Sequence, residues 1–297
     1  MRWLITGSAG RLGVALIARL GADDTGLTGA EDDVIMPLDR AMLDVTDSAA
    51  VHDAVSDFRP DVVVNTATGP VETDGRHAYA VDAVGPAVLA AAVAATGGRL
   101  VHVSCDAVFS GDATGPYPVE APTEPRSAYG RAKLAGELAV RELLPSQGYV
   151  VRTSWLYSGA GDDLVRRTLA TSDPASTTDP VDTEADRSGS PTWVADLAEA
   201  LITLARSDAP AGVYHCTNSG ATSPSGFARA VREERDADPD GSHGDPPPRS
   251  ADRTEPHQAH VVLSGQEWTA AGLAPLPDWR DALHRAFLVD GETSGTD

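Results

Sequence analysis

Tyr129 and Lys133 stand four residues apart in a stretch with a helical pattern of apolar and polar residues. Side chains at this spacing lie one turn apart on the same face of a helix, so we expect the phenol and the ammonium to be neighbours. A nearby ammonium favours the phenolate and is therefore expected to lower the pKa of Tyr129 towards working pH. Such a tyrosine can hand a proton to an alkoxide that forms from a carbonyl. The pair predicts general acid catalysis.

Lys133 is the only lysine in the chain, although Lys and Arg together number 23. Because arginine is used at every other basic position, a solvated helix position would be expected to carry arginine as well. A compact ammonium can reach both a phenol and the ribose of a bound cofactor, whereas the wide planar guanidinium substitutes poorly. This bias favours a chemical role for Lys133 over the alternative of a core tyrosine beside a solvated lysine.

A glycine-rich loop, residues 6–13, follows the first predicted strand and opens the first predicted helix with the spacing G-x-x-G-x-x-G. The first glycine permits a tight turn, the second lets the backbone approach a pyrophosphate, and the third allows close packing of helix on strand. Amides at the helix N-terminus would then hold the pyrophosphate. We predict a dinucleotide site here, with Gly7, Gly10, Arg11, Leu12 and Gly13 as binding residues.

The end of the second predicted strand bears on the choice of dinucleotide. The carboxylate of Asp39 can accept hydrogen bonds from the ribose hydroxyls, which favours NAD(H), whereas Arg40 could meet a 2′-phosphate, so NADP(H) stays open. Asp44 and Val45 are placed to meet the adenine edge. Asp47 is interpreted as the cap of the next helix, and capping is also an alternative for Asp44.

These residues must be positioned by alternating strands and helices. The candidate strands are residues 3–6, 34–38, 61–65, 100–104 and 149–153, and their apolar residues run together, which is typical of parallel strands buried on both faces. The candidate helices between them are 11–20, 47–58, 77–95 and 127–143. Repeated βα units of this kind predict an α/β fold with a doubly wound parallel sheet.

The last third of the chain has a different composition. Residues 172–190 and 233–255 are rich in polar residues and proline and are interpreted as loops. Helices are expected at 193–206, 225–234 and 279–288, and a short strand at 213–216. We therefore expect a dinucleotide-binding core at 1–155, with 189–212 packing back on it, and a small substrate-binding lobe made of 156–188 and 213–297.

Composition excludes several classes of function. The chain has 297 residues and a net charge of −21, which argues against binding to nucleic acid or to an anionic membrane. Its longest apolar stretch, 83–95, is broken by Gly85-Pro86 and is too short to span a bilayer, and the N-terminus is unlike a signal peptide. Two cysteines are too few for a disulfide framework. We expect a cytoplasmic protein without a metal site.

A set of segments carries a resemblance to a known family. The most specific are Ser-x-Asp-x-Val-Phe at 104–109 and Gly-Ser-Pro-Thr at 189–192, and the others lie at 6–13, 43–47, 60–65, 129–137, 152–157, 196–198 and 276–280. The sequence resembles the extended short-chain dehydrogenase/reductase family and, more closely, its dTDP-4-dehydrorhamnose reductase branch. The resemblance implies a Rossmann core and an NAD(P)H-dependent reduction of the 4-keto group of a nucleotide-linked deoxysugar. It leaves a homodimer open.

The family triad is Thr or Ser, Tyr and Lys, and Tyr129 and Lys133 match it. The first member falls at Cys105, whose thiol is a weaker hydrogen-bond donor than a hydroxyl, so the group that polarises the substrate carbonyl is either Cys105 or the neighbouring Ser104. The resemblance further implies Ala67 as a cofactor-binding residue and Asp106 and Trp155 as substrate-binding residues, while core packing is an equal alternative for Trp155. In so acidic a chain an anionic substrate needs a local cation, and Arg187 or Arg166 is the candidate for its diphosphate.

Other positions depart from the family pattern and keep alternatives open. Asp82 stands where the family usually has Asn, and residues 66–72 differ from the usual segment. These departures suit two alternatives, a cofactor-binding regulatory subunit and a ketoreductase of a non-sugar natural product. A dehydratase or epimerase is disfavoured, because Ala107 replaces the acid that dehydratases of this superfamily carry there.

Overall fold

The computed structural model describes residues 1–21, 33–69, 79–159, 164–171, 188–237 and 260–293. Its centre is a six-stranded parallel sheet in the order β2-β1-β3-β4-β5-β9. The strands are β1 Arg2–Thr6, β2 Val34–Leu38, β3 Val62–Asn65, β4 Arg99–Cys105, β5 Gly148–Thr153 and β9 Gly212–His215. The chain moves outwards from β1 to β2 and then returns to the other side of β1 with β3. The doubly wound fold is therefore confirmed.

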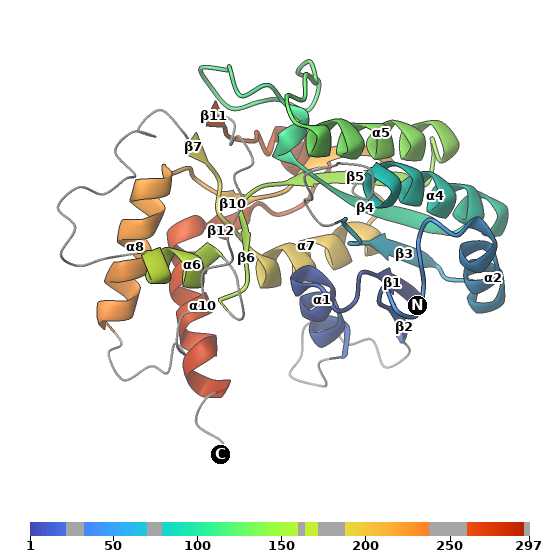
Figure 1. Cartoon of the computed structure of the whole chain (residues 1–297), viewed down its shortest axis with the longest axis horizontal. Coiled ribbons are helices and arrows are strands. Elements are labelled where there is room, and N and C mark those ends of the chain that lie inside the picture. The colour runs from blue at the N-terminus through green and yellow to red at the C-terminus, as the bar shows by residue number, and fades with distance from the viewer. Residues whose placement is uncertain (22–32, 70–78, 160–163, 172–187, 238–259, 294–297) are drawn as a thin grey trace.

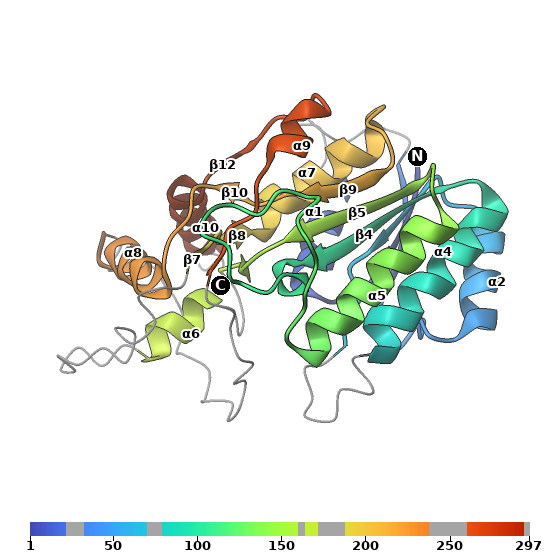
Figure 2. The same cartoon turned by 90° about the horizontal axis from the view of Figure 1, so that it is seen from above.

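Two layers of helices bury the two faces of the sheet. Figure 1 shows α4 (Gly85–Thr96) and α5 (Ala128–Leu143) above the sheet, and α1 (Arg11–Gly21) and α7 (Val194–Arg206) below it. Seen from above in Figure 2, α2 (Ser48–Phe58) continues the layer of α4 and α5. Helix α7 packs beside α1, so this segment does lie back on the core.

The side chains of each strand point alternately to the two faces of the sheet, which explains why the strands carry uninterrupted apolar runs. In β1, Trp3 and Ile5 enter the core cluster shared with α1 and α7, whereas Leu4 enters the cluster on the side of α2, α4 and α5. Successive strand side chains point to opposite faces, and both faces here are covered by helices. Each of these three side chains is fully buried.

The expected single helix at 77–95 is wrong in detail. Ala80–Val84 form a π-helical turn, η1, and α4 starts only at Gly85, whose amide donates to the carbonyl of Ala80. The cause is Pro86, which has no N–H to donate to the carbonyl four residues earlier and whose ring would clash with it. The backbone therefore widens by one residue before the regular helix begins.

The boundary expected at residue 213 also needs correction. Strand β9 pairs with β5 from Tyr149↔Gly212 to Arg152↔His215, so the central sheet extends through His215. A short strand was expected here at 213–216, but nothing in so short a segment indicates which sheet it joins. The core thus takes in a strand that we had assigned to the lobe.

The remaining elements gather beyond the carboxyl ends of the strands. Six short strands form three parallel pairs: β6 (Leu156–Tyr157) with β8 (Thr192–Trp193), β7 (Ser188–Gly189) with β11 (His260–Val261), and β10 (Asn218–Ser219) with β12 (Leu276–Asp278). The helices of this part are η2 (Asp106–Val108), α6 (Leu164–Thr171), α8 (Pro224–Ala237), α9 (Gln266–Ala270) and α10 (Trp279–Thr293). Arg285 of α10 binds both oxygens of Asp196 on α7, each at 2.7 Å, and so ties these elements to the core. Of the proposed loops, 172–187 and 238–255 lie outside the described residues, while Glu233–Ala237 complete α8.

Candidate active site

The glycine loop follows β1 at the point where the sheet changes direction, which is where α/β proteins bind ligands. Gly7 has φ +70°, and a Cβ there would stand 2.7 Å from the amide nitrogen of Ala67. A Cβ on Gly13 would stand 2.4 Å from the carbonyl oxygen of Gly7. Only glycine therefore allows the loop to turn under the β3 loop and into α1. This cradle, with a helix N-terminus at its base, fits a dinucleotide pyrophosphate.

The other predicted cofactor residues lie around this loop in different settings. Ala67 comes directly against Gly7, and Arg11 opens α1 with an exposed side chain. The side chains of Leu12 and Val45 are buried in the core, so only their backbone can face a ligand. A contact between Val45 and the adenine edge, as predicted, would therefore be made by its backbone.

The carboxylates of the acidic residues after β2 accept hydrogen bonds from backbone amides two or three residues further along the chain. Asp39 Oδ1 accepts hydrogen bonds from the amides of Ala41 and Met42 at 2.8 and 3.0 Å. Asp44 Oδ1 accepts from both the amide and the hydroxyl of Thr46, which precedes α2, so Asp44 stabilises a local turn and does not cap the helix. Arg40 is exposed beside them. The helix cap at Asp47 is confirmed, since its side chain accepts from two amides at the start of α2.

A polar ladder joins the carboxyl ends of three strands. Thr6 donates to Asn65 Oδ1 at 2.7 Å, and Asn65 Nδ2 lies 3.1 Å from His102 Nδ1. All three side chains are buried, and the amide of Ala67 donates to the same Asn65 oxygen at 3.1 Å. The ladder fixes the loop that follows β3 against the glycine loop. Sequence reasoning missed this role, because nothing in the spacing of the three residues predicts their contact.

Lys133 is buried, with an exposed fraction of 4%, on the face of α5 towards the sheet. Its Nζ lies 3.0 Å from Asp82 Oδ1 and donates to the carbonyl of Val103 at 3.3 Å. The same Nζ lies 5.9 Å from the centre of the Tyr129 ring. The predicted pair is therefore assembled, and a surface role for Lys133 is excluded.

The pKa of Tyr129 lies in the opposite direction from our expectation. Burial raises it well above its usual value, Cys105 and the Asp82 carboxylate raise it further, and a hydrogen bond from Thr68 lowers it. Asp82 offsets the ammonium of Lys133, which the sequence argument had considered alone. Without a ligand the phenol is thus held in its protonated form. Thr68 is a second site residue that sequence reasoning missed, since only the fold brings the β3 loop to α5.

Ser104 and Cys105, the two candidates for orienting a carbonyl, differ in their surroundings. Ser104 is buried and donates to Glu137 Oε1 at 2.5 Å, in a network with Arg152. Cys105 is half-buried and shares a hydrogen bond with Tyr129. Burial beside Asp106 raises the pKa of its thiol to about 12, so it is a neutral group and a poor nucleophile. The Ser104 alternative is therefore disfavoured, and Cys105 faces the phenol.

Two of the expected substrate residues, Asp106 and Trp155, follow shortly after the ends of β4 and β5. Asp106 accepts a hydrogen bond from the hydroxyl of Ser154 at 2.7 Å, and burial raises the pKa of its carboxyl to about 6. Trp155 has φ +43° and packs its indole on Gly189, where a Cβ would stand 2.4 Å from the ring. It is half-buried, so packing and ligand contact are both open to it. Arg187 and the Arg166 side chain lie outside the described residues.

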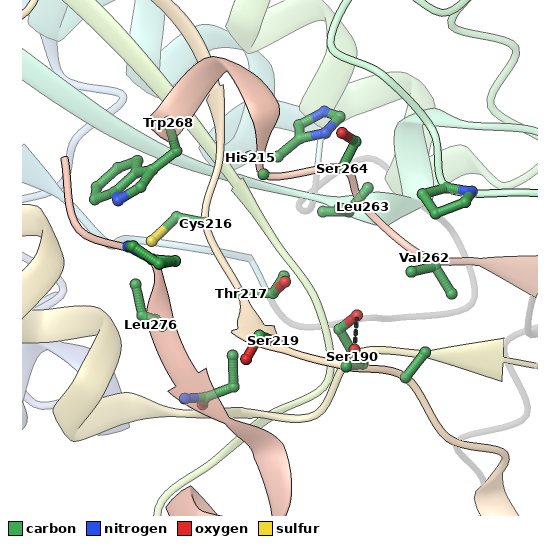
Figure 3. Close-up of a pocket in the computed structure, with 16 residues that line it drawn as sticks. Ser190, His215, Cys216, Thr217, Ser219, Val262, Leu263, Ser264, Trp268 and Leu276 are labelled. Carbon is green, nitrogen blue, oxygen red and sulfur yellow. Dashed lines mark hydrogen bonds between the residues drawn. The ribbon is translucent and has the colours of Figure 1, made fainter. Parts of the chain in front are cut away.

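A separate cavity of about 470 Å³ lies between the end of β9 and the lobe (Figure 3). His215, Cys216, Trp268 and Leu276 line it, and Ser190 closes one side with a hydrogen bond to the carbonyl of Gly220 at 3.0 Å. Burial raises the pKa of the Cys216 thiol. Tyr129 and Lys133 are not among its lining residues, so this cavity is distinct from the predicted catalytic pair.

Two further features concern only the described part of the chain. No group of three His, Cys, Asp or Glu side chains there is arranged to hold a metal ion. Among the same residues, no helix combines the length and the apolarity that crossing a membrane requires.

Comparison with known proteins gives consistent relatives. The family model "RmlD substrate binding domain" matches residues 1–290. A dTDP-4-dehydrorhamnose reductase of Streptomyces griseus is 40% identical, over 96% of this chain and 93% of that protein. A probable dTDP-4,6-dihydroxy-2-methyloxan-3-one 4-ketoreductase of Streptomyces antibioticus is 41% identical, over 97% and 95%.

A solved structure agrees with these sequence relatives. The crystal structure of dTDP-4-dehydrorhamnose reductase from Bacillus anthracis in complex with NADP has a TM-score of 0.80, with 28% identity over 97% of this chain and 99% of that one. The fold, the helix that carries Tyr129 and Lys133, and the full-length similarity thus point to one group. The chain belongs to the RmlD substrate binding domain family, within the dTDP-4-dehydrorhamnose reductase group of extended short-chain dehydrogenases/reductases.

Proposed function

We propose that this protein is an NAD(P)H-dependent reductase of a 4-keto nucleotide-linked deoxysugar. The observation that carries the proposal is the protonated Tyr129 phenol, bordered by Cys105 and Thr68 and backed by the buried Lys133 ammonium. The named relatives, which are reductases of dTDP-linked sugars, support the same reaction class. A carbonyl reductase needs such an acid at the point where the carbonyl oxygen gains charge.

The dinucleotide would be held by the glycine loop, by the start of α1 and by Ala67 at the end of β3. The carboxylate of Asp39, whose Oδ1 serves the turn, would accept hydrogen bonds from the ribose hydroxyls, and the exposed Arg40 beside it would meet a 2′-phosphate. When bound, the reduced nicotinamide supplies the hydride. NADP(H) is the dinucleotide in the related Bacillus anthracis structure, and NAD(H) remains the alternative.

Tyr129 is the proton donor in this proposal. The raised pKa keeps the phenol protonated across the neutral range, which is the form that can donate to the oxygen of a ketone as it becomes an alkoxide. Cys105 and Thr68 both form hydrogen bonds with the phenol, so they would lie beside the carbonyl oxygen of a bound ketone. Lys133 stabilises the phenolate left behind, because its ammonium lies beside the ring.

The substrate would lie between the core and the lobe. Asp106, held by Ser154, and the half-buried Trp155 are the proposed sugar contacts, and Arg187 is the proposed partner of the diphosphate. In this division the core comprises residues 1–155 with 188–216, and most of the remainder forms the substrate lobe. A cytoplasmic location and a homodimer belong to the same proposal, and light scattering at several protein concentrations tests the dimer.

The test is oxidation of NADPH or NADH by the purified protein in the presence of a dTDP-4-keto-6-deoxysugar. We expect turnover, and we expect Tyr129→Phe to abolish it while leaving the dissociation constant of the cofactor within about twofold. Full activity of Tyr129→Phe would overturn the assignment of the acid.

A cofactor-binding regulatory subunit is the second candidate, and Cys105 in the triad favours it. It predicts tight cofactor binding with no turnover of any 4-keto sugar nucleotide, and co-purification with an enzyme. A non-sugar ketone that is reduced while the sugar nucleotides are not would favour the natural-product ketoreductase.

A further inference from the structure

Asp82 forms a buried ion pair with Lys133. The exposed fractions of the two side chains are 0% and 5%, and Asp82 Oδ1 lies 3.0 Å from Lys133 Nζ. Among the described residues, no other acidic side chain is ion-paired with this ammonium. A buried charge pair needs close geometry to offset its loss of hydration, so this contact restricts where the ammonium can be.

The backbone brings the two charges together through the π-helical turn and a glycine. Gly136 lies three residues after Lys133, on the same face of α5. A Cβ on Gly136 would stand 2.4 Å from the carbonyl oxygen of Asp82, so η1 packs directly on the helix backbone. The widened turn that Pro86 imposes thus places Asp82 against α5, with its carboxylate at Lys133.

The second oxygen of Asp82 anchors the loop after β3. Asp82 Oδ2 accepts a hydrogen bond from the amide of Gly69 at 3.2 Å. Gly69 follows Thr68, whose hydroxyl bonds to the Tyr129 phenol. One carboxylate therefore connects the ammonium behind the phenol with the loop in front of it.

Among the residues that the structure describes, few other charged or titratable groups face this group. From β4, His102 is kept neutral because burial and Lys133 hold its pKa well below the usual value. The Cys105 thiol, with a pKa of about 12, is neutral, and the carboxyl of Asp106 titrates at about 6. From α5, Glu137 is paired with Arg152 of β5. Asp82 is thus the acidic group in direct contact with Lys133.

We propose that Asp82 is a positioning residue: its carboxylate holds Lys133 beside Tyr129, anchors the Thr68 loop through Gly69, and balances the charge of the ammonium. The kinetic consequence rests on the proposed function, whereas the ion pair itself can be tested without turnover. Asp82→Asn keeps the shape and one acceptor but removes the charge. The matched control is Asp53→Asn, which removes a carboxylate from an exposed position of α2.

The first test uses the single lysine of the chain. Selective nitrogen-15 labelling of lysine gives one ammonium resonance, and a buried ion pair protects its protons from exchange with water. We expect a resolved signal in the wild-type protein and in Asp53→Asn, and a shifted signal with at least tenfold faster proton exchange in Asp82→Asn. The same signal and exchange rate in Asp82→Asn would overturn the ion pair.

The second test is the pH profile of kcat for ketone reduction. Removing a negative charge beside Tyr129 lowers the pKa of the phenol, so the loss of activity at high pH should begin about one unit lower in Asp82→Asn than in wild type. A purely structural residue would lower Tm without moving this limb. Superimposable profiles would overturn the charge-balancing role.

A charge-conserving variant keeps the test decisive if Asp82→Asn does not fold. Asp82→Glu should retain the high-pH limb of the wild type while lowering kcat, because the longer side chain displaces the ammonium without changing the net charge. A high-pH limb in Asp82→Glu that begins about one unit lower than in wild type would contradict the proposal. If no sugar nucleotide is turned over, the proposed function fails, and the lysine spectrum still decides the role of Asp82.

Discussion

The hydroxyl of Ser104 lies 2.5 Å from Glu137 Oε1, and this contact separates Ser104 from the catalytic pair. Arg152 holds the same carboxylate with three contacts of 2.7 to 3.1 Å, and all three side chains are buried. Next to it on the same strand, Cys105 reaches the Tyr129 phenol instead. Ser104 thus belongs to a buried network of the core, whereas Cys105, the next residue of β4, belongs to the candidate site.

The buried network predicts a split between stability and activity. Ser104→Ala should lower the free energy of unfolding by about 1–3 kcal/mol, because the buried carboxylate of Glu137 loses the hydrogen bond that Ser104 donates. Glu137→Ala should cost about 3–5 kcal/mol, since it leaves the buried Arg152 charge unpaired. Urea denaturation measures both values, and kcat of Ser104→Ala should stay within about threefold of wild type. A large loss of kcat without a loss of stability would return Ser104 to the catalytic group.

Thr68 is predicted to supply the hydroxyl that Cys105 lacks. Thr68→Val should reduce kcat about tenfold, which is equivalent to one hydrogen bond in the transition state. Thr68→Ser keeps the hydroxyl and should therefore keep the kcat of the wild type. Cys105→Ala should cost less than Thr68→Val, because a thiol is the weaker donor. Introducing Cys105→Thr into Thr68→Val should recover part of the loss. Steady-state kinetics of the five proteins decides the point, and a neutral Thr68→Val would refute it.

The glycine loop predicts a backbone requirement for cofactor binding. Gly13→Ala places a Cβ 2.4 Å from the carbonyl oxygen of Gly7 and must displace the loop. We expect the dissociation constant for NADPH to rise at least about tenfold, as measured by nicotinamide fluorescence. Gly21→Ala is the matched control, since nothing lies within 4 Å of the added atom at the other end of α1. Equal binding by the two variants would exclude this role of Gly13.

Asp106 predicts a pH-dependent stability. Its carboxyl has a pKa of about 6 in the folded protein, against 3.8 for an unperturbed aspartate side chain, because burial disfavours the charged form. The folded state therefore binds the proton more tightly, and the stability it contributes is complete below about pH 4 and is lost as the pH rises through about 6. Relative to wild type, Asp106→Asn should gain up to about 2–3 kcal/mol between pH 4 and pH 7. Urea denaturation at the two pH values tests this, and a constant difference would contradict it.

Local patterns predicted the fold correctly. The apolar runs of the strands require burial on both faces, so they indicate a parallel sheet between two helical layers without further information. The four-residue spacing of Tyr129 and Lys133 specifies a shared helix face. The strand β9 was expected, but its sequence does not indicate which sheet it joins, so it was assigned to the lobe and not to the core. The π-helical turn before Pro86 was missed because so short and irregular an element carries little pattern.

The sequence by itself determined the glycine loop, the catalytic helix and the order of the elements, because each depends on residues close together in the chain. Only the tertiary structure decided that Asp82 balances Lys133, that Thr68 reaches the phenol, and that Ser104 turns to Glu137. These contacts join strands and helices that are distant in sequence, and their formation depends on how the layers pack. The direction of the Tyr129 pKa follows from that packing, since burial and a neighbouring carboxylate outweigh the ammonium that local spacing alone would predict.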